Sequence, residues 1–294
     1  MRQMLHTIQN DLLSVTVNER GAELWSILDR DGAEYLWQGD EKYWGDRALT
    51  IFPFVARLYQ GRYEMDGKIY EMPIHGFAPT SMFTLAERTQ RSLTFELVSD
   101  AGTVERYPRA FAFRVVYELR DAELSVSFEV ENRDEKPMYF GLGGHPGFNV
   151  PLEDGKQFED YRLRFGAPCR PSRVGFGDDC LLNGRDVPFQ LDEDVVLPLG
   201  HELFDDDAII LKDMAREVTL EAKDGGKSVT VSYPDMTYLG VWHWPKTDAP
   251  YVCIEPWSSL PARSGRIEKF ENKPDLICLE SQKTYRNRWT ICIR

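Results

Sequence analysis

Alternation of apolar and polar residues with a period of two runs through much of this chain and restricts it to folds built from β-strands. In residues 113–119 (FRVVYEL) the odd positions are apolar, and in residues 124–130 (LSVSFEV) the even positions are apolar. Successive side chains of a strand point to opposite faces of its sheet, so each run predicts a strand with one buried and one solvated face. The link between them, residues 120–123 (RDAE), predicts a short hairpin connection.

The same pattern recurs along the chain. Residues 93–97 (LTFEL) alternate, and residues 218–222 (VTLEA) and 228–232 (SVTVS) flank an Asp-Gly-Gly at 224–226 that is typical of a hairpin turn. Near the start, residues 29–32 (DRDG) are expected to join two further strands. Many short antiparallel strands separated by Gly and Asp turns predict an all-β fold, a large antiparallel β-sandwich.

Helical patterns are weak. Short helical turns are expected in residues 40–47 and around residues 203–207, and an amphipathic helix of ten or more residues is not indicated. The 294 residues, 42% of them hydrophobic, suffice for a large core, and all-β chains reach this length as one domain. Pro and Gly are spread evenly, without a linker or a repeat, which favours a single domain over residues 1–294.

Charge and cysteine usage exclude several classes of protein. With 35 basic and 48 acidic residues the net charge is −13, which argues against nucleic acid as a partner and mildly against a polyanionic substrate.

No stretch reaches the roughly 18 apolar residues of a membrane span, and the first residues lack a signal-peptide core. Five cysteines without CxxC spacing indicate reduced thiols in a cytoplasmic protein rather than a zinc cluster, although the spacing would allow a Cys169–Cys180 disulfide.

Two of the five histidines lie among Gly and Phe residues. His75 lies between Pro73 and Gly76, which predicts a loop or a strand end; taken alone, it is more often a histidine bonded to nearby backbone than a catalytic one. His145 follows glycines at positions 141, 143 and 144 and precedes Pro-Gly. Such a density of glycine permits positive φ angles and lets the backbone approach a ligand closely; the alternative is a Gly-rich turn that happens to carry a histidine.

A carboxylate lies in a run that otherwise looks buried. Residues 251–257 (YVCIEPW) predict a core strand with Glu255 at its end beside Trp257. Partial desolvation would raise the pKa of this carboxyl group toward the range of a general base. The alternative is a structural ion pair with Arg263 or Arg266.

Aromatic residues gather near this carboxylate in sequence. Trp242, Trp244 and Trp257 are candidates to stack against the C–H face of a pyranose ring, and we expect at least one of them to line a site. Core packing is the alternative and the commoner fate of tryptophan in strands.

Two polar elements could contact such a ring. Arg57 follows the apolar run of residues 52–56 and is either a ligand contact, a surface cation or the partner of an internal acid. The acidic run of residues 205–207 (DDD) is typical of a solvated turn, but one of its carboxylates could accept hydrogen bonds from sugar hydroxyls.

Four segments in this order resemble the aldose 1-epimerase (galactose mutarotase-like) family: residues 52–57 (FPFVAR), 75–77 (HGF), 143–149 (GGHPGFN) and 255–257 (EPW). The HGFA of residues 75–78 is similar to the LacX-like branch. The resemblance spans nearly the whole chain. It implies the β-supersandwich fold of that family and the interconversion of α- and β-anomers of an aldose.

The resemblance also implies roles. Glu255 would deprotonate the anomeric hydroxyl as base, His145 would protonate the ring oxygen as acid, His75 would help to bind and polarise the ring-oxygen region, and Arg57 would contact hydroxyls. The reaction needs no metal and no cofactor. The expected partner is a small-molecule sugar, with neither nucleic acid nor membrane involved, and a homodimer is left open.

The sugar-binding Asp of the family should fall within residues 203–211. Asp206 fits best by its spacing to the apolar residues 209–211, with Asp207 nearly equal. Trp242 and Trp257 complete the expected substrate contacts.

Three other functions stay open. A hexose-6-phosphate epimerase would need cations such as Arg57, Arg62 and Arg263 to converge on the phosphate. A non-catalytic sugar-binding protein would not need His145 and Glu255 together. A metal-dependent enzyme could use both histidines and Glu255 as ligands.

Overall fold

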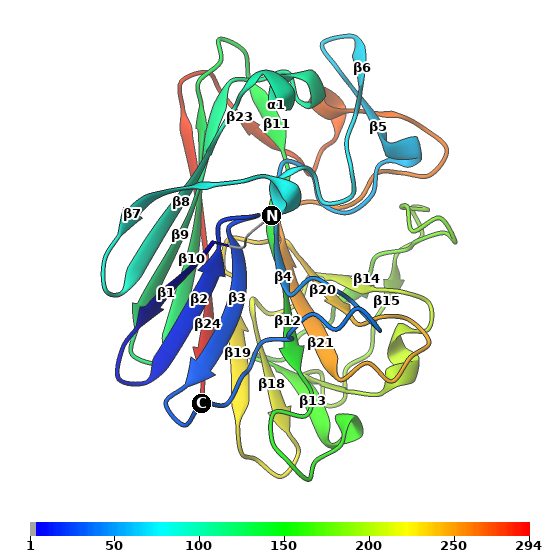
Figure 1. The fold of residues 1–294 in the computed structure, drawn as a ribbon. Helices are drawn as coiled ribbons and strands as arrows, with labels where there is room; N and C mark the ends of the chain where they lie inside the picture. The colour runs from blue at the N-terminus through cyan, green and yellow to red at the C-terminus, as the bar shows by residue number, and fades with distance from the viewer. Residues whose placement is uncertain (1–3) are drawn as a thin grey trace.

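The computed structural model describes residues 4–294 and contains two large antiparallel sheets (Figure 1). In spatial order the nine-stranded sheet consists of β16 (Val196–Pro198), β13 (Tyr161–Phe165), β18 (Glu217–Ala222), β19 (Ser228–Ser232), β24 (Thr284–Ile293), β10 (Glu123–Asn132), β9 (Phe111–Arg120), β8 (Ser92–Val98) and β7 (Thr84–Arg88). The seven-stranded sheet consists of β15 (Val187–Pro188), β14 (Ser172–Arg173), β17 (Ile209–Lys212), β20 (Tyr238–Trp242), β21 (Tyr251–Trp257), β12 (Gly143–Asn149) and β4 (Ala48–Ile51).

Smaller elements surround these sheets. They are the sheet of β1 (Leu5–Gln9), β2 (Leu13–Asn18) and β3 (Glu23–Asp29), the sheet of β22 (Glu268–Lys269), β5 (Arg62–Met65) and β6 (Lys68–Glu71), and the pair of β11 (Met138–Phe140) and β23 (Ile277–Leu279). The helical elements are α1 (Ala101–Arg106) and the 3₁₀ turns η1 (Tyr59–Gly61), η2 (Ala78–Thr80), η3 (Phe158–Asp160), η4 (His201–Phe204) and η5 (Phe270–Asn272). Across residues 4–294, no helix has the length and apolarity needed to cross a bilayer.

The predicted all-β fold and its central hairpins are confirmed. β9 and β10 contain the two runs that alternate most clearly, and they pair antiparallel with Arg120 opposite Glu123. The connecting turn places Asp121 at φ +52°, a left-handed conformation that Asp tolerates. β18 and β19 pair around the predicted Asp-Gly-Gly turn, where Gly225 has φ +88°.

Three local expectations need correction. The turn after β3 forms, with Gly32 donating to the carbonyl of Asp29, but the chain beyond it makes only an isolated bridge between Glu34 and Leu28. Residues 40–47 form turns without a helix, and the helical turn expected near residue 203 begins earlier, at η4.

The α-helix α1 was not expected, because its six residues carry no apolar period. It is started by a capping box, in which Asp100 accepts a hydrogen bond from the Thr103 amide at 2.8 Å while the Thr103 hydroxyl accepts one from the Asp100 amide at 2.7 Å.

The main core lies where alternate residues of both large sheets meet. Phe113 and Phe128 enter it from the nine-stranded sheet, and Val252 and Ile254 enter it from β21. All four side chains are essentially inaccessible to solvent. The seven-stranded sheet therefore turns its even-numbered β21 residues toward the core and its odd-numbered ones toward the opposite face, which places the site described below.

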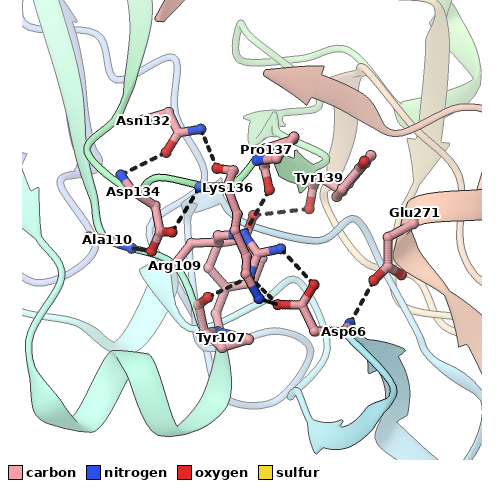
Figure 2. Close-up of polar contacts among 11 residues, drawn as sticks. Asp66, Tyr107, Arg109, Ala110, Asn132, Asp134, Lys136, Pro137, Tyr139 and Glu271 are labelled. Atoms are coloured by element: carbon pink, nitrogen blue, oxygen red, sulfur yellow. Dashed lines mark hydrogen bonds and ion pairs between the residues drawn. The ribbon is translucent and has the colours of Figure 1, made fainter. Parts of the chain in front are cut away.

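A buried arginine ties together three connections at one end of the molecule (Figure 2). Arg109 is 2% exposed; its guanidinium donates to both oxygens of Asp66 at 3.0 and 3.3 Å and to the carbonyl of Pro137 at 2.7 Å. Lys136 donates a further bond to Asp66 at 2.9 Å. These contacts join the β5–β6 turn to the start of β9 and to the link between β10 and β11, and the two cations hold the pKa of Asp66 below its ordinary value.

We expect Arg109→Ala to lower the free energy of unfolding by about 2–4 kcal/mol, because it deletes charge-assisted bonds and leaves a buried carbonyl without its donor. Urea unfolding followed by tryptophan fluorescence measures this change. Arg62→Ala is the matched control: the Arg62–Glu71 pair is solvent-exposed, so its loss should cost less than about 1 kcal/mol. Equal effects of the two substitutions would contradict a special role for the buried network.

Candidate active site

A cleft of about 990 Å³ lies on the face of the seven-stranded sheet turned away from the main core. Strands β4, β12, β20 and β21, which lie side by side in Figure 1, contribute to its lining. The eight residues assigned to the site from the sequence all line this one cleft: Arg57, His75, His145, Asp206, Asp207, Trp242, Glu255 and Trp257. Trp244, the third candidate tryptophan, lines it as well.

Strand β21 carries the carboxylate through the centre of this sheet. All seven of its residues are buried, and its neighbours are β20 and β12. Val252 and Ile254 pack into the main core, while Cys253, Glu255 and Trp257 belong to the opposite face. Glu255 therefore lies inside the strand, two residues before its end, and not at the end as expected from the sequence.

The glycines before His145 provide space rather than special backbone angles. His145 lies within β12, and the glycines at positions 141, 143, 144 and 147 are absent from the residues with positive φ. A Cβ at Gly144 would lie 2.5 Å from Cζ2 of Trp289, and one at Gly143 would lie 2.8 Å from Cδ1 of Trp257. The positive φ angles that glycine permits are thus not used here; glycine is required because Cβ atoms at these two positions would overlap the rings of Trp289 and Trp257.

His75 is held in a turn, as the sequence indicated. Its amide donates to the carbonyl of Ala56 at 3.0 Å, and its Nδ1 accepts from the Ala56 amide at 3.3 Å. An Nδ1 that accepts leaves the proton of the neutral ring on Nε2. The backbone of His75 has φ +62°, an unfavourable conformation for a residue with a Cβ. Such strain recurs at functional positions, where surrounding contacts hold it in place.

The two imidazoles and the carboxylate converge. Nε2 of His145 lies 3.1 Å from Oε2 of Glu255, and the rings of His75 and His145 stand edge to face with centroids 5.2 Å apart. The indole of Trp44 packs on His145 at 4.8 Å between centroids. Nδ1 of His145 and Oε2 of Glu255 are buried without an aligned hydrogen-bond partner among residues 4–294, an arrangement that is uncommon for buried polar atoms.

Burial shifts the pKa of each of these groups. Desolvation, with a further contribution from the charge of Asp207, raises the pKa of Glu255 well above its ordinary value. Desolvation and the neighbouring His75 lower the pKa of His145 well below its ordinary value. Desolvation and the charge of Arg57 lower the pKa of His75 to about 4. Both imidazoles are therefore neutral at pH 7 in the free protein, and the Glu255 carboxyl group holds a proton more readily than a solvent-exposed carboxyl group does.

The aspartates of the acidic run, residues 205–207, have different surroundings. Asp206 is exposed at the cleft, whereas the Asp207 carboxylate accepts one bond from Nε1 of Trp242 at 2.8 Å and another from Sγ of Cys180 at 3.0 Å. Spacing favoured Asp206, but the contacts to the cleft wall belong to Asp207. Arg57 is exposed at the cleft surface.

Two site residues were missed by sequence reasoning. Trp44 lies in the segment interpreted only as a helical turn, and Cys180 was considered only as one half of a disulfide. All five cysteines are free. A tryptophan flanked by Tyr43 and Gly45 was a visible aromatic signal, but nothing in the sequence related Cys180 to the acidic run.

The other pairings considered for the site residues fall elsewhere. Arg266 pairs with Glu268 at 2.9 Å, and the Arg263 amide donates to the same carboxylate, so neither is the partner of Glu255. Neither Arg62 nor Arg263 lines the cleft. For a metal ion the structure groups Cys253, rather than His75, with His145 and Glu255; their ligand atoms lie within 4.8 Å of one another.

Comparison with known proteins agrees with this architecture. The family model described as aldose 1-epimerase matches residues 4–287. The plasmid-encoded protein LacX of Lactococcus lactis subsp. lactis is 34% identical over 301 residues, covering 97% of this chain and 98% of LacX. The chain belongs to the aldose 1-epimerase family.

Solved structures of the family superpose closely. A galactose mutarotase related enzyme from Lactobacillus acidophilus gives a TM-score of 0.94 at 32% identity, covering 99% of this chain and 97% of that one. A galactose mutarotase-like protein from Lactobacillus casei gives a TM-score of 0.92 at 31% identity, covering 99% and 100%. The all-β fold of the present chain is thus the galactose mutarotase-like fold.

We expect Gly144→Ala to destabilise the protein by about 1–3 kcal/mol, because the new methyl group would overlap the Trp289 ring in a packed core. Thermal unfolding measures the loss. Gly102→Ala in α1 is the control: its Cβ would have its nearest neighbour at 3.5 Å, and its φ is not positive, so stability should be unchanged or slightly increased. A Gly144 variant as stable as the wild type would refute the packing explanation.

Proposed function

We propose that the protein is an aldose 1-epimerase, which interconverts the α- and β-anomers of an aldose by opening and reclosing the ring. The observation that carries the proposal is the buried contact of 3.1 Å between His145 and Glu255 at the cleft. A desolvated acid–base pair beside an open cleft suits proton transfer to and from a neutral sugar.

The reaction balances protons within this pair. Ring opening removes a proton from the anomeric hydroxyl and adds one to the ring oxygen. Because the pKa of Glu255 is raised and that of His145 is lowered, the two groups share one proton in the free protein. The reactive form has this proton on His145, so that Glu255 takes the hydroxyl proton while His145 protonates the ring oxygen. The carbonyl then rotates, and closure on its other face inverts the anomeric centre.

The surrounding residues bind and orient the sugar in this scheme. His75, with its ring proton on Nε2, donates toward the ring-oxygen region, and Arg57 donates to hydroxyls. Asp207 accepts from hydroxyls, and the indoles of Trp242 and Trp257 offer apolar faces to the pyranose ring.

The choice of sugar is part of the proposal. The names of two similar structures refer to galactose mutarotase, which makes free hexoses the first substrates to test. A hexose 6-phosphate would need converging cations, and of the three considered in the sequence only Arg57 lines the cleft. Anomer exchange measured by NMR or polarimetry, with glucose and glucose 6-phosphate side by side, separates the two classes.

We expect His145→Ala and Glu255→Gln each to lower kcat for anomer exchange by a factor of about 10² to 10⁴, because each removes one partner of the proton transfer. His201→Ala is the matched control, since His201 contacts His243 at 3.1 Å and does not line the cleft. Sugar binding, measured by calorimetry, should survive in both site variants. Exchange that continues at the wild-type rate in both would leave a sugar-binding protein in place of the enzyme.

We expect the pH profile of kcat/KM to be bell-shaped. The acidic limb of the profile reports the binding of a second proton to the pair. Because the pKa of His145 is lowered, this limb lies below the ordinary histidine value of 6.5. At high pH the shared proton is lost, and the raised pKa of Glu255 places that limb above the ordinary value of 4.5. A profile that lacks either limb across the whole pH range in which the protein stays folded is incompatible with two-group catalysis.

A further inference from the structure

Asp207 is fixed at the cleft from two sides. Its Oδ1 accepts from the indole of Trp242 at 2.8 Å, and its Oδ2 accepts from the thiol of Cys180 at 3.0 Å. Its backbone has φ +74° and is closed by a turn in which its amide donates to the carbonyl of Phe204 at 3.0 Å. A non-glycine residue in this conformation persists where surrounding contacts hold it, so the orientation of this carboxylate is specified rather than incidental.

The two donors differ in origin. Trp242 ends β20, inside the seven-stranded sheet, and its indole is a rigid donor. Cys180 lies in the loop between β14 and β15 and lines the cleft. The Trp242 contact alone would leave the carboxylate free to rotate about that one bond. The Cys180 contact removes this freedom and fixes which lone pairs face the cleft.

The loop that carries Cys180 is anchored. The Leu182 amide donates to the carbonyl of Ala262 at 2.9 Å, and the Ser264 amide donates to the carbonyl of Leu182 at 3.0 Å. The Ser264 hydroxyl donates to Asp179 at 2.5 Å. The position of Cys180 is therefore set by residues 262–264, a segment that follows shortly after the end of β21 at Trp257.

The thiol is suited to donate. Burial and the bond to Asp207 raise the pKa of Cys180 to about 11, so the S–H proton is retained at neutral pH. The negative charge of Asp207 in turn raises the pKa of Glu255.

We propose that Cys180 is a positioning residue, whose thiol holds the Asp207 carboxylate in the orientation that receives the sugar hydroxyls. This inference rests on the proposed function and extends it to a residue that does not itself touch the reacting atoms. It also assigns the sugar-binding role in the acidic run to Asp207 and leaves Asp206 as a solvated neighbour.

The test compares Cys180→Ala with Cys180→Ser in anomer exchange on a free hexose that the wild type turns over. Alanine removes the donor and should raise KM about 3- to 10-fold, the effect expected for one hydrogen bond of ordinary strength, with kcat within about twofold. Serine restores a donor and should return KM to within about twofold of the wild type. Cys292→Ala, on β24 in the other sheet, is the matched control and should change neither constant.

A double-mutant cycle with Asp207→Asn locates the effect. If Cys180 acts through Asp207, the alanine substitution should change KM by less than about twofold in the Asp207→Asn background. Unfolding midpoints of the Cys180 variants should stay within about 3 °C of the wild type, as for substitutions at partly exposed positions.

Several results would overturn the inference. They are a wild-type KM in Cys180→Ala, a serine variant as impaired as the alanine variant, or an unchanged alanine effect in the Asp207→Asn background. The proposed function fails separately, if the wild-type protein accelerates anomer exchange of no aldose.

Discussion

Removal of one carboxylate from water is the constraint on which the site depends. Glu255 is 1% exposed in a central strand whose every residue is buried. An ionised carboxylate in such a place is costly, and proteins meet that cost with a paired group, a proton or a ligand. Here the facing group is His145, itself buried and biased toward its neutral form. The same burial therefore disfavours charge on both members of the pair.

Packing behind the strands keeps this pair in place. The odd-numbered residues of β21 can face the cleft only because Val252 and Ile254 fill the core between the sheets. β12 can lie flat against its neighbours only because Gly143 and Gly144 make room for the rings of Trp257 and Trp289. The glycines thus support the His145–Glu255 contact indirectly, through the close packing of indole rings against the strand that carries His145.

The cleft has a floor formed by the strands of the seven-stranded sheet and a rim formed by connecting segments, and the two are built differently. Floor residues come from paired strands, whereas Cys180 and Asp207 come from connections that meet only in the folded protein. Trp242 joins the two zones, since its indole bonds Asp207 and its ring lies edge to face with His145 at 5.7 Å. Trp242 thus contacts both the Asp207 carboxylate at the rim and the His145 ring on the floor.

The sequence by itself determined the strands, the hairpins and the identity of the residues at the cleft. Period-two alternation is a local property, so β9, β10, β18 and β19 could be read from it. The four short motifs marked Arg57, His75, His145, Glu255 and Trp257, whereas Asp206, Asp207 and Trp242 were expected from residue type and spacing. The sequence pattern did not predict α1, because this six-residue helix is started by a capping box and has no apolar period. A strand was expected after the turn at residues 29–32, but the structure has only an isolated bridge at Glu34 there.

Only the tertiary structure decided which groups touch. The contact of His145 with Glu255 joins residues 110 positions apart, counted from their numbers, and depends on β12 and β21 being neighbours in the sheet. The choice of Asp207 over Asp206 and the contact with Cys180 depend on side-chain direction in a turn, which spacing does not encode. Desolvation is likewise a property of the packed molecule, since the chain specifies a carboxyl group but its burial shifts the pKa.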